Sequence, residues 1–273
     1  MGARALTFRA PSPLPGWTRG RVLTHPARSA GSRGRLLASA RGGVDLPQYA
    51  DEAQRAREIE EDAGRPAAVL LDDMDTALRR FLAAAGDHPA DAWEVPVRWL
   101  GGGLRPVRGV VGSMLREVEV HHTDLATGHG PDRRPALLVG RELETTVRRL
   151  RDDPGAPPMT LVADEDRIPR VTGAGPGPRV TGPAADLPGW LTGRTDGGAL
   201  AVEPPGHLPA HRSGAADRAR PATGLASAQR RGRGWCAASP AWARASSATA
   251  ASSAGVVVRW PRSVRTYGVN MPR

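Results

Sequence analysis

A carboxylate and an imidazole four residues apart are the clearest chemical feature of the sequence. Glu117 and His121 stand in the run from Leu115 to Leu125, whose apolar spacing predicts one amphipathic helix. Positions i and i+4 lie one turn apart on the same helix face, so both side chains can reach a single divalent metal. His25, far upstream, is a candidate third ligand. Two nitrogens and one oxygen with an open fourth position are typical of catalytic zinc.

The pair alone does not establish a metal site. Glu and His at this spacing also occur by chance, as solvated neighbours on a polar helix face. His122 is an alternative ligand, although it points about 100° away from His121 on a helix. Asp124 could hydrogen-bond a ligand imidazole or be a plain polar residue at the helix end. Two His and one carboxylate also suit iron, so the metal's identity stays open.

Helix patterns dominate the first half of the chain, and short strand patterns follow. Helices are expected over about 18–41 with Thr18 as the cap, and over 51–63, 67–85, 110–126 and 136–151. Residues 87–108 look like a long loop without regular structure. Strand candidates are 159–163, 170–172, 179–181 and 200–202, with a short helix over 183–192. This order predicts a mainly α fold, with a helical domain over 1–152 and a small α/β domain over 158–210.

The positive charge is concentrated at one end of the chain. The formal net charge is +10, every one of the 38 basic residues is Arg, and residues 211–273 hold 11 Arg and one acid, Asp217. Residues 1–210 therefore hold 27 basic and 27 acidic residues. The Ala-, Ser- and Arg-rich tail is typical of a disordered segment. Such a tail binds nucleic acid weakly and without specificity, so we do not expect a nucleic-acid partner.

Segments for export or membrane insertion are not evident. The N-terminus lacks the continuous apolar stretch of a signal peptide, and no run of about 18 apolar residues predicts a membrane helix. The single cysteine, Cys236, excludes an internal disulfide and a cysteine metal cluster. We therefore expect a soluble, cytoplasmic protein with no membrane partner.

Three motifs in order resemble the mycothiol-dependent maleylpyruvate isomerase family. They are Leu14-Pro15-Gly16-Trp17-Thr18-Arg19-Gly20 with Leu23-Thr24-His25, then Arg116-Glu117-Val118-Glu119-Val120-His121-His122-Thr123-Asp124-Leu125, and finally Gly182-Pro183-Ala184-Ala185-Asp186-Leu187 with Trp190-Leu191-Thr192-Gly193-Arg194. The resemblance covers roughly residues 11–210. It implies a DinB-like four-helix bundle, followed by a small α/β domain.

The resemblance also implies a chemistry. It implies metal ligands at His25, Glu117 and His121, a divalent metal that is usually zinc, and mycothiol as a low-molecular-weight thiol cofactor. Arg194 falls where the family has a basic residue near that cofactor. The implied reaction is cis–trans isomerisation of maleylpyruvate to fumarylpyruvate, or transfer of the thiol to another small electrophile. The substrate could be a dicarboxylate, which a cationic Arg would orient.

Metal and thiol fit together chemically. A thiol becomes a good nucleophile only as a thiolate, and a bound metal favours that form. Because the only cysteine lies in the tail, the sulfur would come from outside the chain. A non-catalytic metal- or thiol-binding protein of the same fold is the alternative.

Three departures from the family pattern favour that alternative. Only about a dozen residues precede Leu14, so the first bundle helix could be truncated. Pro26 directly follows His25 and disfavours helical geometry there, so His25 is the weakest ligand unless the helix begins at Thr24. Pro188 and Gly189 interrupt the helix expected over 183–192.

Overall fold

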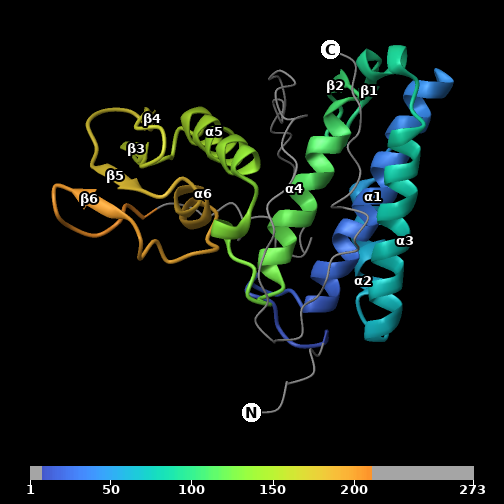
Figure 1. Cartoon of the computed structure of the whole chain (residues 1–273), viewed down its shortest axis with the longest axis horizontal. Coiled ribbons are helices and arrows are strands. Elements are labelled where there is room, and N and C mark those ends of the chain that lie inside the picture. Colours follow the sequence, from blue (N-terminus) through green and yellow to red (C-terminus); the bar gives the residue numbers. More distant parts are fainter. Residues whose placement is uncertain (1–7, 211–273) are drawn as a thin grey trace. The chain divides into compact units, whose positions relative to one another are not determined.

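The computed structural model describes residues 8–210, which divide into two compact units (Figure 1). Of the described residues, 8–12 and 17–127 form a helical unit, and 13–16 and 128–210 form an α/β unit. The tail predicted to be disordered, 211–273, lies outside the described residues. Within residues 8–210, no helix is both long and apolar enough to cross a bilayer.

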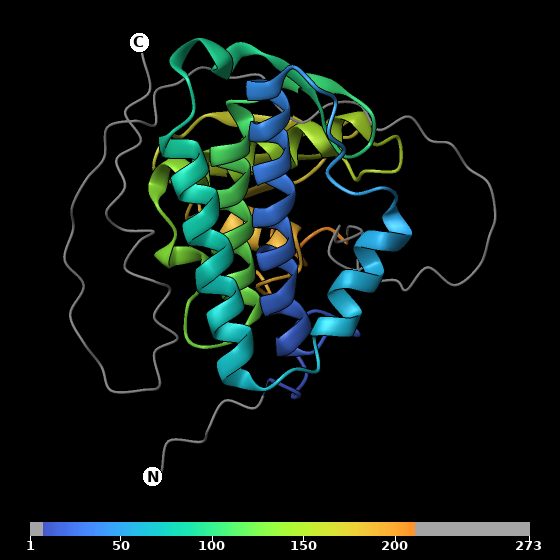
Figure 2. The ribbon, with the colours of Figure 1, turned by 90° about the vertical axis from the view of Figure 1, so that its right-hand side faces the viewer.

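Four helices build the helical unit: α1 (Arg19–Gly42), α2 (Glu52–Asp62), α3 (Ala67–Gly86) and α4 (Gly109–Asp124). α1 contacts the other three, and Figure 2 shows α1, α3 and α4 running side by side. Each long helix buries an apolar stripe, the usual driving force for a bundle. The buried side chains include Val22, Leu23, Leu36 and Leu37 from α1, Leu70, Met74, Leu78 and Phe81 from α3, and Val110, Met114 and Val118 from α4.

Pro26 does not break α1, and the helix expected over 18–41 is confirmed. The helix begins at Arg19, not at Thr24, and continues through Pro26 to Gly42. The Thr18 side chain caps its start by accepting from the backbone N–H of Arg21 at 3.2 Å. A proline removes one helical hydrogen bond, but packing of α1 against three helices outweighs that loss. His25 therefore has helical geometry.

The segment between α3 and α4 is more regular than the loop that we expected. It contains a 3-10 helix, η1 (Ala90–Glu94), and two short antiparallel strands, β1 (Pro96–Arg98) and β2 (Leu104–Pro106). Gly101 and Gly102 adopt positive φ values of 93° and 88°, which the turn between the strands requires and which other residues rarely adopt. Trp93 and Trp99 are buried in the core.

The α/β unit contains α5 (Ala136–Asp152) and a four-stranded sheet. Its strands are β3 (Met159–Ala163), β4 (Pro169–Thr172), β5 (Arg179–Gly182) and β6 (Ala201–Glu203), in the order β4-β3-β5-β6. β3 pairs in parallel with β5, and the other pairings are antiparallel. α5 belongs with this sheet, although we had placed it with the bundle. The reason is its apolar face, where Leu143 and Val147 join the core formed by β3, β5 and α6.

Pro188 and Gly189 do not interrupt α6 (Asp186–Leu191), which directly follows β5 in the chain. A short 3-10 helix, η2 (Pro131–Arg133), precedes α5. Pro188 is the third residue of α6, in the first turn, where proline is tolerated. Gly189 suits the close packing of the helix, because a Cβ there would lie 3.2 Å from Pro131 Cγ, a tight contact. The helix is shorter than the 183–192 expected, and the mainly α fold with a small α/β part is confirmed.

Candidate metal centre

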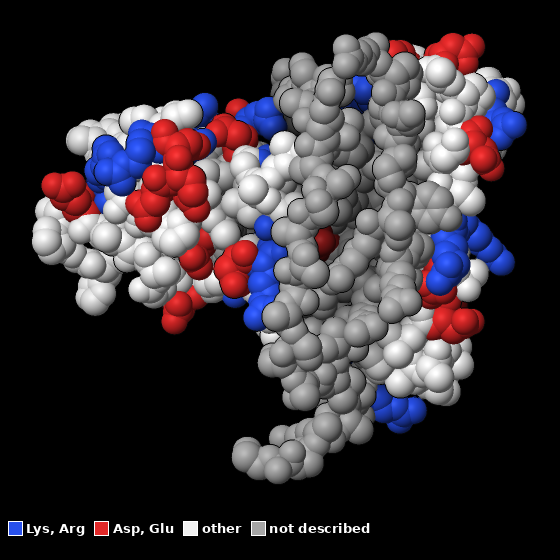
Figure 3. Space-filling view, viewed as in Figure 1, with Lys and Arg blue, Asp and Glu red and all other residues white. Residues whose placement is uncertain are grey.

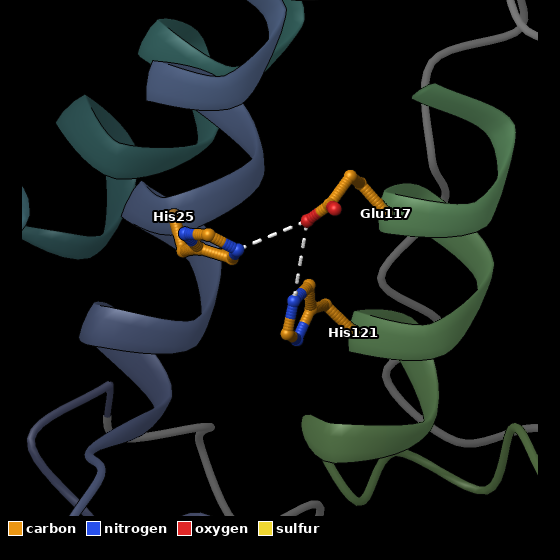
Figure 4. A group of neighbouring side chains, drawn as sticks. All are labelled: His25, Glu117 and His121. Carbon is orange, nitrogen blue, oxygen red and sulfur yellow. Dashed lines mark ion pairs between the residues drawn. The ribbon is translucent and has the colours of Figure 1, made fainter. Parts of the chain in front are cut away.

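α1 and α4 bring the three predicted ligands together inside the helical unit (Figure 4). His25 Nε2 lies 2.9 Å from Glu117 Oε2, and His121 Nε2 lies 3.5 Å from the same oxygen. One ligand atom from each residue lies within 4.8 Å of the other two. The three side chains are 10–15% exposed, so the group is nearly but not fully closed to solvent.

The donor set and its spacing fit a divalent metal. A zinc ion held tetrahedrally at about 2.0–2.1 Å separates its ligand atoms by about 3.3 Å, close to the distances between Oε2 and the two nitrogens. Oε2 of Glu117 is also shielded from solvent and accepts no well-formed hydrogen bond. A buried carboxylate oxygen without a donor is costly, and a cation between the three atoms would satisfy it.

Asp124 orients His121 from behind. Its Oδ2 lies 2.9 Å from His121 Nδ1, and Asp124 itself is only 1% exposed. Burial lowers the pKa of His121, but the Asp124 carboxylate and then Glu117 outweigh burial, so that the pKa is raised. A proton held on Nδ1 by Asp124 leaves the Nε2 lone pair directed at Glu117 and His25, as a metal ligand requires.

Arg33 holds the other oxygen of Glu117. Its Nη2 lies 3.2 Å from Glu117 Oε1 and 2.8 Å from Ser113 Oγ, and its Nη1 donates to the Ser29 carbonyl at 3.1 Å. Burial raises the pKa of Glu117, but the nearby imidazoles of His121 and His25 and the charge of Arg33 outweigh it, and the pKa lies well below the usual range. Glu117 is therefore an anion at neutral pH.

His25 is packed between an aromatic ring and a cation. Trp17 meets it edge-on with the ring centroids 5.7 Å apart, and lies parallel to His121 at 6.4 Å. On the other side, Arg55 Nη2 lies 3.4 Å from His25 Nδ1. Burial lowers the pKa of His25 to about 4 despite Glu117. The ring is therefore neutral at physiological pH, and a neutral imidazole can ligate a metal.

The remaining predicted residues have different positions. Within residues 8–210, the group able to share a metal does not include His122. Arg194 follows α6 in the α/β unit, where its backbone N–H donates to the Gly189 carbonyl at 2.8 Å. Its role beside a thiol cofactor stays a prediction. On the face of the molecule in Figure 3, Arg and acidic residues are interspersed over the described residues.

Sequence reasoning missed Arg33, Ser113 and Arg55. A sequence signal existed for one of them, because Ser113 precedes Glu117 by four residues and so lies on the same face of α4. Arg33 reaches Glu117 through the packing of α1 against α4, and Arg55 reaches His25 through the packing of α2 against α1, which no local pattern reveals.

The chain resembles known proteins in sequence and in fold. The family model described as mycothiol maleylpyruvate isomerase N-terminal domain matches residues 2–126. Two crystal structures of the mycothiol-dependent maleylpyruvate isomerase, one of them a histidine-to-alanine mutant, match with a TM-score of 0.70 and 21% identity. Each match covers 74% of this chain and 84% of that chain, and at this identity it shows a shared fold. No curated protein matched the chain.

Proposed function

We propose that this chain belongs to the mycothiol-dependent maleylpyruvate isomerase family and is a metal- and thiol-dependent enzyme acting on a small electrophile. The family and the fold indicate a maleylpyruvate isomerase-like protein. We propose in addition that the metal is zinc, that His25, Glu117 and His121 bind it, and that mycothiol is the thiol. The convergence of two imidazole nitrogens and one carboxylate oxygen on one point supports this proposal most directly.

When bound, the metal would favour the thiolate form of mycothiol, a nucleophile suited to reversible addition to an electrophilic double bond. The chain's own residues prepare for this. Asp124 keeps the proton of His121 on Nδ1, and Arg33 leaves only Oε2 of Glu117 facing the two imidazoles. The Trp17 ring shields the imidazole pair from water on one side.

One observation favours the alternative, a protein of the same fold that binds metal or thiol without catalysis. Arg55 carries only hydrogen-bond donors, so His25 Nδ1 can pair with it only as an acceptor. That pairing places the ring proton on Nε2, the atom that must be unprotonated to bind a metal. The Arg55 side chain therefore has to turn away before His25 ligates. Its exposure of 26% leaves room for this movement.

The proposal is tested by loading the purified protein with zinc and adding mycothiol and maleylpyruvate. We expect NMR to show fumarylpyruvate formation that depends on both zinc and mycothiol and that stops in His121→Ala. A second assay with a chromogenic electrophile would report thiol transfer. Bound zinc with no thiol-dependent turnover in either assay would favour the non-catalytic alternative.

A further inference from the structure

We propose that Arg33 is a positioning residue that sets the electrophilic strength of the metal centre by acting on Glu117. The proposal rests on the function proposed above and deepens it. It starts from an unusual placement, since Arg33 is only 8% exposed in the interior of a helical bundle. A buried guanidinium is costly unless it is paired and hydrogen-bonded.

The contacts of Arg33 are directed at one oxygen of Glu117. Nη2 reaches Oε1 at 3.2 Å, while Nε and Nη2 both reach Ser113 Oγ, at 3.2 and 2.8 Å. Ser113, Glu117 and His121 follow one another at intervals of four along α4, so the serine and the ligands share one helix face. The guanidinium is thus anchored from α1 and α4 and occupies Oε1. Glu117 can then offer a metal only one oxygen, Oε2.

The charge of Arg33 matters as much as its geometry. Around the centre, the charges of Glu117 and Asp124 are negative and that of Arg33 is positive, while Arg55, beside His25, is paired with Glu52 and the pair adds no net charge. A metal-bound imidazole is neutral. A divalent cation added to this set leaves a net charge of about +1, whereas without Arg33 the sum is about zero. A positive centre with one-oxygen ligation favours an anionic fourth ligand. For a thiol-dependent enzyme, that ligand is a thiolate.

The test replaces the metal with Co²⁺, which is visible by absorption, and uses 2-mercaptoethanol as the thiol probe. The measured quantities are the d–d spectrum and the pH midpoint at which the sulfur-to-cobalt charge-transfer band appears. We expect Arg33→Met to free Oε1, so that Glu117 binds through both oxygens and the d–d absorption weakens. We also expect the pH midpoint to rise by about one unit or more, as for loss of a nearby opposite charge.

Two further variants make the test specific. Arg33→Lys keeps the charge and is expected to bring the pH midpoint back toward the wild-type value. If the methionine variant does not fold, the lysine variant tests the geometric part of the proposal through its d–d spectrum. Arg170→Met is the matched control, because Arg170 is a buried arginine with two acidic partners in the α/β unit. It is expected to lower stability and to leave both cobalt signals unchanged.

The outcomes separate this inference from the proposed function. If wild-type protein binds Co²⁺ and Arg33→Met shows the same spectrum and midpoint, the role of Arg33 is overturned and the metal site stands. If the wild-type protein itself takes up no Co²⁺, the proposed function fails, and the role of Arg33 fails with it.

Discussion

His121 Nδ1 lies 2.9 Å from Oδ2 of Asp124, one of the most deeply buried charged side chains in the described part of the chain. Both residues lie at the C-terminal end of α4, three positions apart. Their contact fixes the ring of a proposed ligand before any metal arrives. An imidazole held in this way loses little freedom on binding, and its basicity at Nε2 is raised.

Replacing Asp124 by Asn is therefore expected to weaken metal binding by about 10- to 100-fold. Asn keeps the size of the side chain but removes the charge that holds the His121 proton on Nδ1. Competition with a chromogenic chelator measures the affinity. Glu119→Gln, the same chemical change on the same helix, is the control and should leave affinity within about twofold. Equal affinities for all three proteins would show that Asp124 does not support the site.

Gly20 is expected to be irreplaceable by alanine for a packing reason. A Cβ at Gly20 would lie well inside contact distance of the Ala63 carbonyl oxygen, which follows α2. We expect Gly20→Ala to destabilise the protein in urea unfolding, although alanine favours helix. Gly31→Ala, on the same helix with open space around it, should instead stabilise by about 0.5–1 kcal/mol. A stabilising Gly20→Ala would contradict this packing of α1.

Pro26 is expected to cost stability without controlling the metal site. Since α1 continues through it, the residue mainly withholds one helical hydrogen bond. Pro26→Ala should raise the free energy of unfolding by about 1–3 kcal/mol and leave metal content unchanged. A variant that unfolds more easily, or that loses metal, would show that the proline shapes the position of His25.

The stability of the metal-free protein should fall in acid because of His25. Burial lowers the pKa of His25 to about 4 in the folded protein, against 6.5 in the unfolded chain. Between these pH values the unfolded chain binds the proton and the folded protein does not. The free energy of unfolding therefore decreases as pH falls from 6.5 to 4. Urea unfolding of chelator-treated protein across this range should show a shallower slope for His25→Gln, and an unchanged slope would refute the assignment.

Local patterns predicted the parts of this protein that depend on local physics. The helices and strands were found because their apolar spacing and capping residues act within a few positions, as at Thr18. The ligands Glu117 and His121 could be paired because one helix turn joins them. Proline effects were overestimated, since packing of α1 overrides the preference of Pro26, and Pro188 falls in a first turn.

Contacts between distant segments could not be predicted in the same way. Arg33 meets Glu117 across 84 positions of sequence, and Arg55 meets His25 across 30. Such pairs depend on how α1, α2 and α4 pack, which is decided by the whole core. His25 was a candidate third ligand from its residue type, but only the family resemblance implied that it shares a metal with Glu117 and His121.

The central claim is that His25, Glu117 and His121 bind one metal ion. Its most direct test is the metal content of purified protein, measured by elemental analysis for wild type, His121→Ala and His122→Ala. We predict about one zinc per chain in wild type and in His122→Ala, and a loss of that zinc in His121→Ala. No metal in the wild type, or metal lost with His122 and kept without His121, would contradict the claim.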